Sequence, residues 1–192
     1  MIIVKERKLQ KMKNYYDMRV FGNRYFNGKV EITDPCYDKD SWCRLTTDIK
    51  PGNYYLLYLE KDEGDWGTRV AQIAILNSDE EMDSFYIDNL VEFCIGEIGV
   101  DAGLAGFFEN KPDYDDNAWV EFCNNLRNKD ADADVWQIDC GYFSESGYGD
   151  GGYLVFGYKN DKNEVVGLCI YFIDDMYEKD ADEDYDEEDE NE

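Results

Sequence analysis

Three aspartates stand beside glycine or proline at points where predicted strands end. Asp34 precedes a proline, Asp101 lies within the segment 99–103, and Asp150 lies within the glycine-rich segment 146–152. Small residues let a ligand approach the backbone closely, and carboxylate oxygens are preferred ligands of Ca²⁺ and Mg²⁺. The pattern therefore offers a shared site for a divalent cation or a polar ligand, with Asp101 and Asp150 the best candidates and Asp34 a weaker third. The alternative, which turn chemistry favours, is that each aspartate only caps its own turn.

The chain contains no histidine. This absence removes Ser-His-Asp and Cys-His catalysis, His-ligated zinc and iron, and imidazole acid–base chemistry. Carboxylate chemistry and divalent metals on oxygen ligands remain. We identify no catalytic residue and expect no cofactor, with calcium or magnesium at Asp101 and Asp150 as the alternative. These observations favour a non-enzymatic protein without excluding an enzyme.

Two literal motif matches lack their structural context. Residues 147–152 fit G-x-G-x-x-G, but a strand pattern at 153–156 follows where a dinucleotide-binding site needs a helix. Asp130, Asp132 and Asp134 fit the first positions of an EF-hand loop, but the glycine and glutamate required later in that loop are missing. Both segments are therefore predicted to be ordinary turns or loops.

The chain is strongly acidic, with a net charge of −26 that is unevenly distributed. Residues 1–29 hold eight Lys or Arg against two acidic residues, whereas residues 174–192 hold thirteen acidic residues against one lysine. The remaining segment, 30–173, carries −20 by difference. An acidic field of this density repels nucleic acid and anionic membranes and attracts basic surfaces. The charge therefore points to a basic partner.

The six cysteines include no Cys-x-x-Cys pair, and the N-terminus becomes charged within a few residues. The latter argues against a secretory leader, and no segment has the apolar length of a membrane span. We therefore expect a cytoplasmic protein whose thiols are reduced and mostly buried as small hydrophobic side chains.

Strand patterns dominate the chain, and its aromatic content of 16% is typical of pleated, half-buried surfaces. One amphipathic helix is predicted, beginning after Asp113 or Asp115 and ending near Asn128. Strands are predicted at 19–26, 29–33, 45–47, 53–60, 68–76, 84–87, 91–98, 135–144, 153–158 and 165–173.

This order predicts a mainly β fold of the β-rich α+β class, an antiparallel sandwich or bent sheet with one inserted helix. The predicted organisation is a basic N-terminal arm at 1–17, a single globular domain at 18–173 and a disordered acidic tail at 174–192.

Several segments in a fixed order resemble an uncharacterised family of bacterial and phage proteins, a domain of unknown function. They read ITDPCY, PGNYYLLYLE, WGTRVAQIAI, GVDAGLAGFF and SGYGDGGYLVFGYKNDKNEVVGLCIYF. The resemblance covers roughly residues 30–173. It implies one β-rich domain and no particular reaction. The chain departs from the family pattern in its basic arm, in the 107–134 insert with its helix, and in its acidic tail.

The leading functional hypothesis is a non-enzymatic protein whose acidic surface docks on a basic protein surface. Phage-type proteins of this size and charge include inhibitors that occupy the nucleic-acid-binding surface of a host defence protein, as anti-CRISPR and anti-restriction DNA mimics do. Neither direct nucleic-acid binding nor membrane binding is expected. The alternative is a metal- or small-ligand-binding domain, or a carboxylate-based hydrolase, that uses the three turn aspartates. Trp42, Trp66 and Trp119 are candidates to line its pocket unless they belong to the core.

Overall fold

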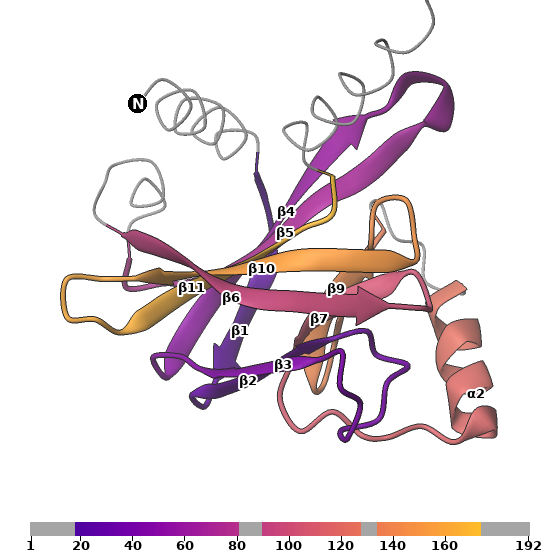
Figure 1. The fold of residues 1–192 in the computed structure, drawn as a ribbon, viewed down its shortest axis with the longest axis horizontal. Coiled ribbons are helices and arrows are strands. Elements are labelled where there is room, and N and C mark those ends of the chain that lie inside the picture. Colours follow the sequence, from indigo (N-terminus) through magenta and orange to yellow (C-terminus); the bar gives the residue numbers. More distant parts are fainter. Residues whose placement is uncertain (1–17, 81–89, 128–133, 174–192) are drawn as a thin grey trace, which may run out of the picture.

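The computed structural model, which describes residues 18–80, 90–127 and 134–173, consists mainly of antiparallel strands (Figure 1). In chain order its elements are β1 (Arg19–Phe26), β2 (Lys29–Thr33), β3 (Leu45–Asp48), β4 (Gly52–Asp62), the 3-10 turn η1 (Gly64–Trp66), β5 (Thr68–Asn77), β6 (Val91–Val100), β7 (Leu104–Phe108), α2 (Asp116–Arg127), β8 (Val135–Ile138), β9 (Gly141–Glu145), β10 (Gly151–Lys159) and β11 (Val165–Tyr171). The predicted strand at 84–87, the arm at 1–17 and the tail at 174–192 lie outside the described residues, as does most of the calcium-loop-like segment.

The strands form two antiparallel sheets packed as a sandwich, which confirms the predicted fold class. The larger sheet has the order β1-β4-β5-β11-β10-β6 and the smaller one the order β3-β2-β7-β9-β8. The main core lies between them, and β4 shows how alternation builds it. Tyr54 and Leu56 point into that core, whereas Leu57 joins a second apolar cluster with Ala74 and Cys169. No helix among the described residues is long and apolar enough to cross a membrane.

Helix α2 packs beside the smaller sheet (Figure 1). Asp115 caps it, because its Oδ1 accepts a hydrogen bond of 2.9 Å from the amide of Ala118. Leu126 lies in a cluster with Phe108 of β7 and Phe143 of β9. The predicted helix and its cap are therefore both present.

Strand β7 was not predicted from the sequence, and burial explains why. All five of its residues are buried, since the sandwich core covers one face and the α2 cluster the other. A strand covered on both faces has no alternation of apolar and polar residues to mark it. Its glycine and short apolar run therefore resemble a loop in the sequence.

The single strand predicted at 135–144 is wrong, because the chain reverses at Asp139 and Cys140. Ile138 pairs with Gly141, so β8 and β9 form a tight hairpin. The two tip residues include neither the glycine nor the asparagine that marks the favoured two-residue hairpin turns, and the reversal was therefore invisible in the sequence.

The expectation that the cysteines are mostly buried is only partly met. All six thiols are free, but only Cys43 and Cys169 are fully buried, and Cys94 is exposed on the edge strand β6.

Two glycines of the smaller sheet make room for aromatic rings on the strands opposite them. Gly106 pairs with Phe143 and Gly141 pairs with Phe108. The two phenylalanine rings stack on each other with centroids 5.8 Å apart. A ring laid across a glycine in the neighbouring strand covers backbone that the glycine leaves bare.

We predict that Gly106→Ala destabilises the fold severely. A methyl group there would lie 2.3 Å from the carbonyl oxygen of Tyr142 and 2.3 Å from Cβ of Phe143, so backbone must move. The free energy of unfolding, measured by urea denaturation, should fall by at least about 1–3 kcal/mol. Gly22→Ala is the matched control, because its methyl meets the flexible end of Gln137 at 3.3 Å and Cδ1 of Leu56 at an ordinary contact distance of 4.0 Å. Equal losses in the two variants would contradict the close approach at Gly106.

Candidate binding site at the glycine-rich strand ends

Asp34 is a fully buried carboxylate that ties two turns together. Its Oδ1 accepts a hydrogen bond of 2.8 Å from the amide of Cys36 in its own turn. Its Oδ2 accepts bonds of 2.9 and 2.6 Å from the amides of Asp101 and Ala102, which follow β6. Burial raises the pKa of Asp34, and these N–H donors oppose the rise by stabilising the charged form. Asp34 is thus a capping and bridging group, and its oxygens are already occupied.

Asp101 and Asp150 face a common cavity. Val100 pairs with Gly151 at the ends of β6 and β10, so Asp101 and Asp150 each lie one residue beyond the last pair of these two strands. The cavity has a volume of about 570 Å³ and is lined on its other side by aromatic, hydroxyl and thiol groups, namely Tyr37, Ser41, Trp42 and Cys43. Two of the three aspartates singled out in the sequence therefore meet at one site, and the third lies buried behind it.

The glycine-rich loop before β10 forms part of the same assembly. The amide of Ser146 donates to the carbonyl of Gly103 at 3.0 Å, and the hydroxyl of Tyr153 donates to the carbonyls of Ser146 and Gly149 at 2.8 and 2.6 Å. Gly147 and Gly149 have positive φ values of 62° and 106°, which favour glycine. The loop leads into strand β10, so the literal G-x-G-x-x-G match is a strand connection, as predicted.

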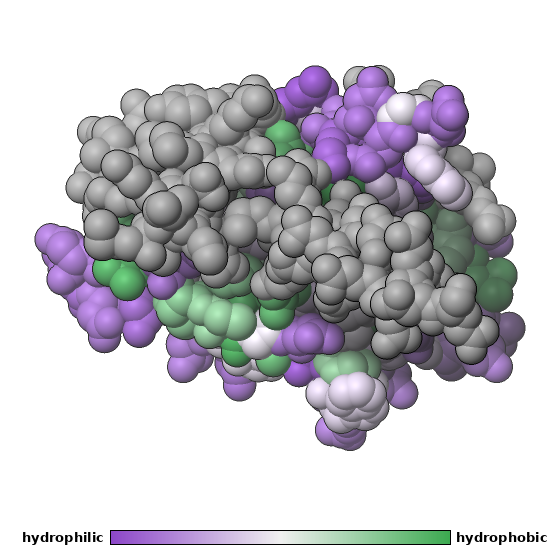
Figure 2. Space-filling view, turned by 45° about the horizontal axis from the view of Figure 1, so that its top comes forward, coloured by the Kyte–Doolittle hydropathy of each residue, from purple (hydrophilic) through white to green (hydrophobic). Residues whose placement is uncertain are grey.

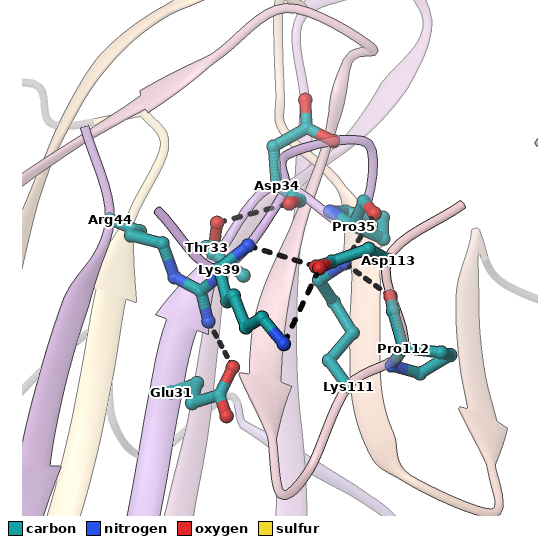
Figure 3. Close-up of polar contacts among 9 residues, drawn as sticks. All are labelled: Glu31, Thr33, Asp34, Pro35, Lys39, Arg44, Lys111, Pro112 and Asp113. Carbon is teal, nitrogen blue, oxygen red and sulfur yellow. Dashed lines mark hydrogen bonds and ion pairs between the residues drawn. The ribbon is translucent and has the colours of Figure 1, made fainter. Parts of the chain in front are cut away.

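Buried cations fix the β2–β3 connection, residues 34–44, from beneath (Figure 3). Lys111, only 6% exposed, donates to the carbonyls of Pro35 and Pro112 at 3.1 and 2.8 Å. Burial and the nearby charge of Arg44 lower the pKa of Lys111. Arg44 itself is buried and forms an ion pair with Glu31 on β2.

A further contact holds the middle of this connection. The backbone amide of Lys39 donates a hydrogen bond of 2.9 Å to Oδ1 of Asp113. The ammonium group of Lys39 lies 3.8 Å from Oδ2 of Asp113. The carbonyl of Cys43 accepts a bond of 2.9 Å from the amide of Gly99 on β6. The connection is thus attached at several points along its length.

Trp42 stands out on this connection because 95% of its surface is exposed. Trp66, at the tip of the β4–β5 hairpin, is 70% exposed. Trp119 behaves differently and stacks against Phe122 with ring centroids 5.2 Å apart. Of the three tryptophans considered for a pocket, Trp42 lines the cavity that holds Asp101 and Asp150, and the other two do not.

Four exposed carboxylates belong to this region: Asp101 and Asp150 line the cavity together with Trp42, and Asp38 and Asp40 precede Trp42 in the same connection. Within the described residues, none of the four takes part in an ion pair. The basic side chains of this region have other partners. Arg44 pairs with Glu31, Lys39 pairs with Asp113, and Lys111 donates to backbone carbonyls. In Figure 2, the coloured residues that remain visible around the grey atoms are hydrophilic at the edges of the view, with hydrophobic patches between them.

A second recess lies on the other side of the glycine-rich loop. It has a volume of about 550 Å³ and combines apolar residues of α2 with Arg69, Trp136 and Glu145. Burial and the charge of Asp134 raise the pKa of Glu145. Sequence reasoning missed this recess, since no motif relates β5, β8 and β9, and only folding brings them together.

The described residues contain no group of three or more cysteine or acidic side chains placed to hold a metal ion. At the predicted site this follows from the role of Asp34, whose oxygens bind backbone amides. Two facing carboxylates remain there, which is fewer oxygen ligands than calcium takes. The calcium or magnesium hypothesis therefore stays a prediction without a ligand set.

Comparisons with protein-family models, with curated proteins and with solved structures gave no match for this chain. The resemblance to an uncharacterised bacterial and phage family therefore stays a prediction. The function must be argued from the geometry of the site.

We predict that Asp34→Asn lowers the stability of the fold. The asparagine amide has one acceptor oxygen and would turn an NH₂ group toward at least one backbone donor. The free energy of unfolding should fall by about 1.5–3 kcal/mol, the range for a hydrogen bond to a charged group. Asp40→Asn, an exposed change of the same kind in the same connection, should stay within about 0.5 kcal/mol of the unchanged chain. Urea denaturation of both variants provides the measurement. A loss of stability in Asp34→Asn that is no larger than the loss in Asp40→Asn would refute the bridging role.

We predict that calcium does not raise the thermal midpoint of the chain. A ligand that binds only the folded state must raise it, and two carboxylates are fewer oxygen ligands than calcium takes. Melting curves with calcium chloride, measured at matched ionic strength, test this. A rise in the unchanged chain that disappears in Asp101→Asn or Asp150→Asn would restore the cation hypothesis.

Proposed function

We propose that this protein is a non-enzymatic binding protein that docks on a basic protein surface through the Trp42 face. We define this face as Trp42 with Asp38, Asp40, Asp101 and Asp150. The observation that carries the proposal is an almost fully exposed tryptophan that shares a cavity with two exposed carboxylates and a connection with two more, none of which forms an ion pair within the described residues. Tryptophan is enriched among the residues that dominate binding energies at protein interfaces, and carboxylates steer a basic partner toward it.

The attachment of residues 34–44 also supports an interface. The Asp34 bridge, the buried Lys111 and the Arg44–Glu31 pair hold the backbone on which the face is built. A surface that is already ordered loses less conformational entropy when a partner binds. The charges can therefore meet a partner at fixed spacing.

Carboxylates at fixed spacing on an acidic domain can stand where phosphates would stand on a nucleic acid. A basic groove that binds DNA or RNA would then bind this face as well, and the two ligands would compete. The proposal therefore includes an inhibitor-like role at the nucleic-acid-binding surface of a partner protein. The charge of −20 on residues 30–173 supports this role independently of the acidic C-terminal segment.

The test begins with affinity capture by the full-length chain from a bacterial lysate and continues with quantitative binding to the captured partner. We expect the association rate to fall by about tenfold or more between low and physiological salt. Duplex DNA or RNA, whichever the partner binds, should compete with the chain.

Charge variants then locate the surface. Asp38→Asn with Asp40→Asn should weaken binding, and Trp42→Ala should accelerate dissociation. The control pair, Asp48→Asn with Asp161→Asn, removes the same charge at the far end of the β3 and β10 strands and should leave binding nearly unchanged. Salt-independent affinity, or equal losses in the two charge pairs, would contradict the proposal.

A further inference from the structure

We propose that the cavity between Trp42 and the Asp101–Asp150 pair receives an arginine side chain of the partner. This inference rests on the proposed function and names the group that the Trp42 face recognises. The cavity has a volume of about 570 Å³, which is within the range of small-ligand pockets and ample for one guanidinium group.

The facing carboxylates require a cation of a certain shape. Asp101 follows β6 and Asp150 precedes β10, each one residue beyond the last pair, Val100 with Gly151, and both line the same cavity. Like charges on neighbouring strands repel each other. Within the described residues, no lysine or arginine lines this cavity or pairs with either residue. A cation supplied from outside relieves this repulsion. Guanidinium has five N–H donors in a flat fork, so it can bond to two carboxylates at once.

Trp42 supplies the second feature that favours arginine. The flat guanidinium group stacks on an indole ring and loses less hydration than an ammonium group does. An indole that is 95% exposed makes almost no contacts within the fold, so its ring is available to a partner. Lysine presents a single, strongly hydrated charge and gains less from both the ring and the carboxylate pair.

The inside of the cavity is also fixed in place. The backbone amide of Asp101 is bonded to Asp34, and a hydrogen bond to the Asp101 side chain contributes to the raised pKa of the Tyr37 hydroxyl. The bond between Gly99 and Cys43 joins the two walls at 2.9 Å. An incoming side chain therefore meets walls that are joined to each other before it binds.

The direct experiment uses the full chain labelled with ¹⁵N and three probes: the N-acetyl methylamides of arginine, lysine and citrulline. Trp42→Phe assigns the indole N–H signal of Trp42 in the NMR spectrum. We expect a saturable shift of this signal and of the amides of Asp101 and Gly151 with the arginine probe. The lysine probe should bind at least about fivefold more weakly. The uncharged citrulline probe, which has nearly the shape of arginine, should give no saturable shift.

Variants identify the groups responsible. Asp101→Asn with Asp150→Asn should weaken arginine binding about tenfold or more, and Trp42→Ala should reduce it severalfold. Trp66→Ala and Asp161→Asn are the controls and should bind the probe like the unchanged chain. Well-dispersed amide spectra confirm that the variants are folded, and Trp42→Ala keeps the test valid if the aspartate variant does not fold. Equal binding of arginine and lysine, binding of citrulline, or no effect of Trp42→Ala would overturn the inference.

The failure of this inference is distinguishable from failure of the proposed function. If a captured partner binds with strong salt dependence but tolerates replacement of each interface arginine by lysine, the arginine cavity is wrong and the docking face stands. If the arginine probe binds at Trp42 but no basic partner engages the face, the cavity stands and the proposed function is wrong.

Discussion

The buried carboxylate of Asp34 is the constraint on which the candidate site depends. It lies at the end of β2, and its two oxygens hold three backbone amides from turns that are 65 or more residues apart in the chain. Without it, the 34–37 turn and the turn after β6 would each lose the acceptor of part-buried amide groups, which is costly. The pairing of β6 with β10 then brings Asp150 to the same end of the sheet as the turn that Asp34 holds.

Charge separation on this side of the molecule follows from the same architecture. Burying Arg44 and Lys111 under the β2–β3 connection costs hydration, which Glu31, Asp113 and several carbonyl groups offset. Because these cations are turned inward, the acids on the outer surface keep their charges unneutralised within the described structure. The acidic face therefore does not follow from amino-acid composition alone. It also depends on the burial of the basic side chains beneath the β2–β3 connection.

The strands predicted from the sequence are of two kinds. Burial alternates along β1, β4 and β10, whereas β5 and β11 are almost entirely buried but form long apolar runs. The amphipathic pattern of α2 is equally plain. Strand β7 escaped prediction because it is buried on both faces and is only five residues long, with a glycine among them. The β8–β9 reversal escaped because its tip lacks a turn signature.

The site was predictable only in outline. Aspartates beside glycines mark strand ends, and the closeness of Asp101 to Asp150 follows once β6 and β10 are known to pair. The burial of Asp34 was not predictable, because an Asp-Pro turn has the same sequence whether its carboxylate faces water or the interior. The exposure of Trp42 was equally hidden, because tryptophan is highly buried on average and no sequence pattern marks this one as exposed.

The exposure of Trp42 indicates an interaction surface, because leaving an indole in water forgoes the free energy of burying it. A free loop would collapse its indole onto the nearest apolar surface, since burying that ring is favourable by several times the thermal energy. Residues 34–44 are instead attached to other elements at Asp34, Lys39 and Arg44, and the indole of Trp42 remains exposed. The connection therefore keeps in water a side chain that would be more stable covered, beside two carboxylates that would be more stable with a cation. A ligand that is flat and positively charged covers the indole and neutralises the carboxylates at the same time. The guanidinium group of arginine has both properties, so this one group explains the face better than separate hydrophobic and ionic contacts do.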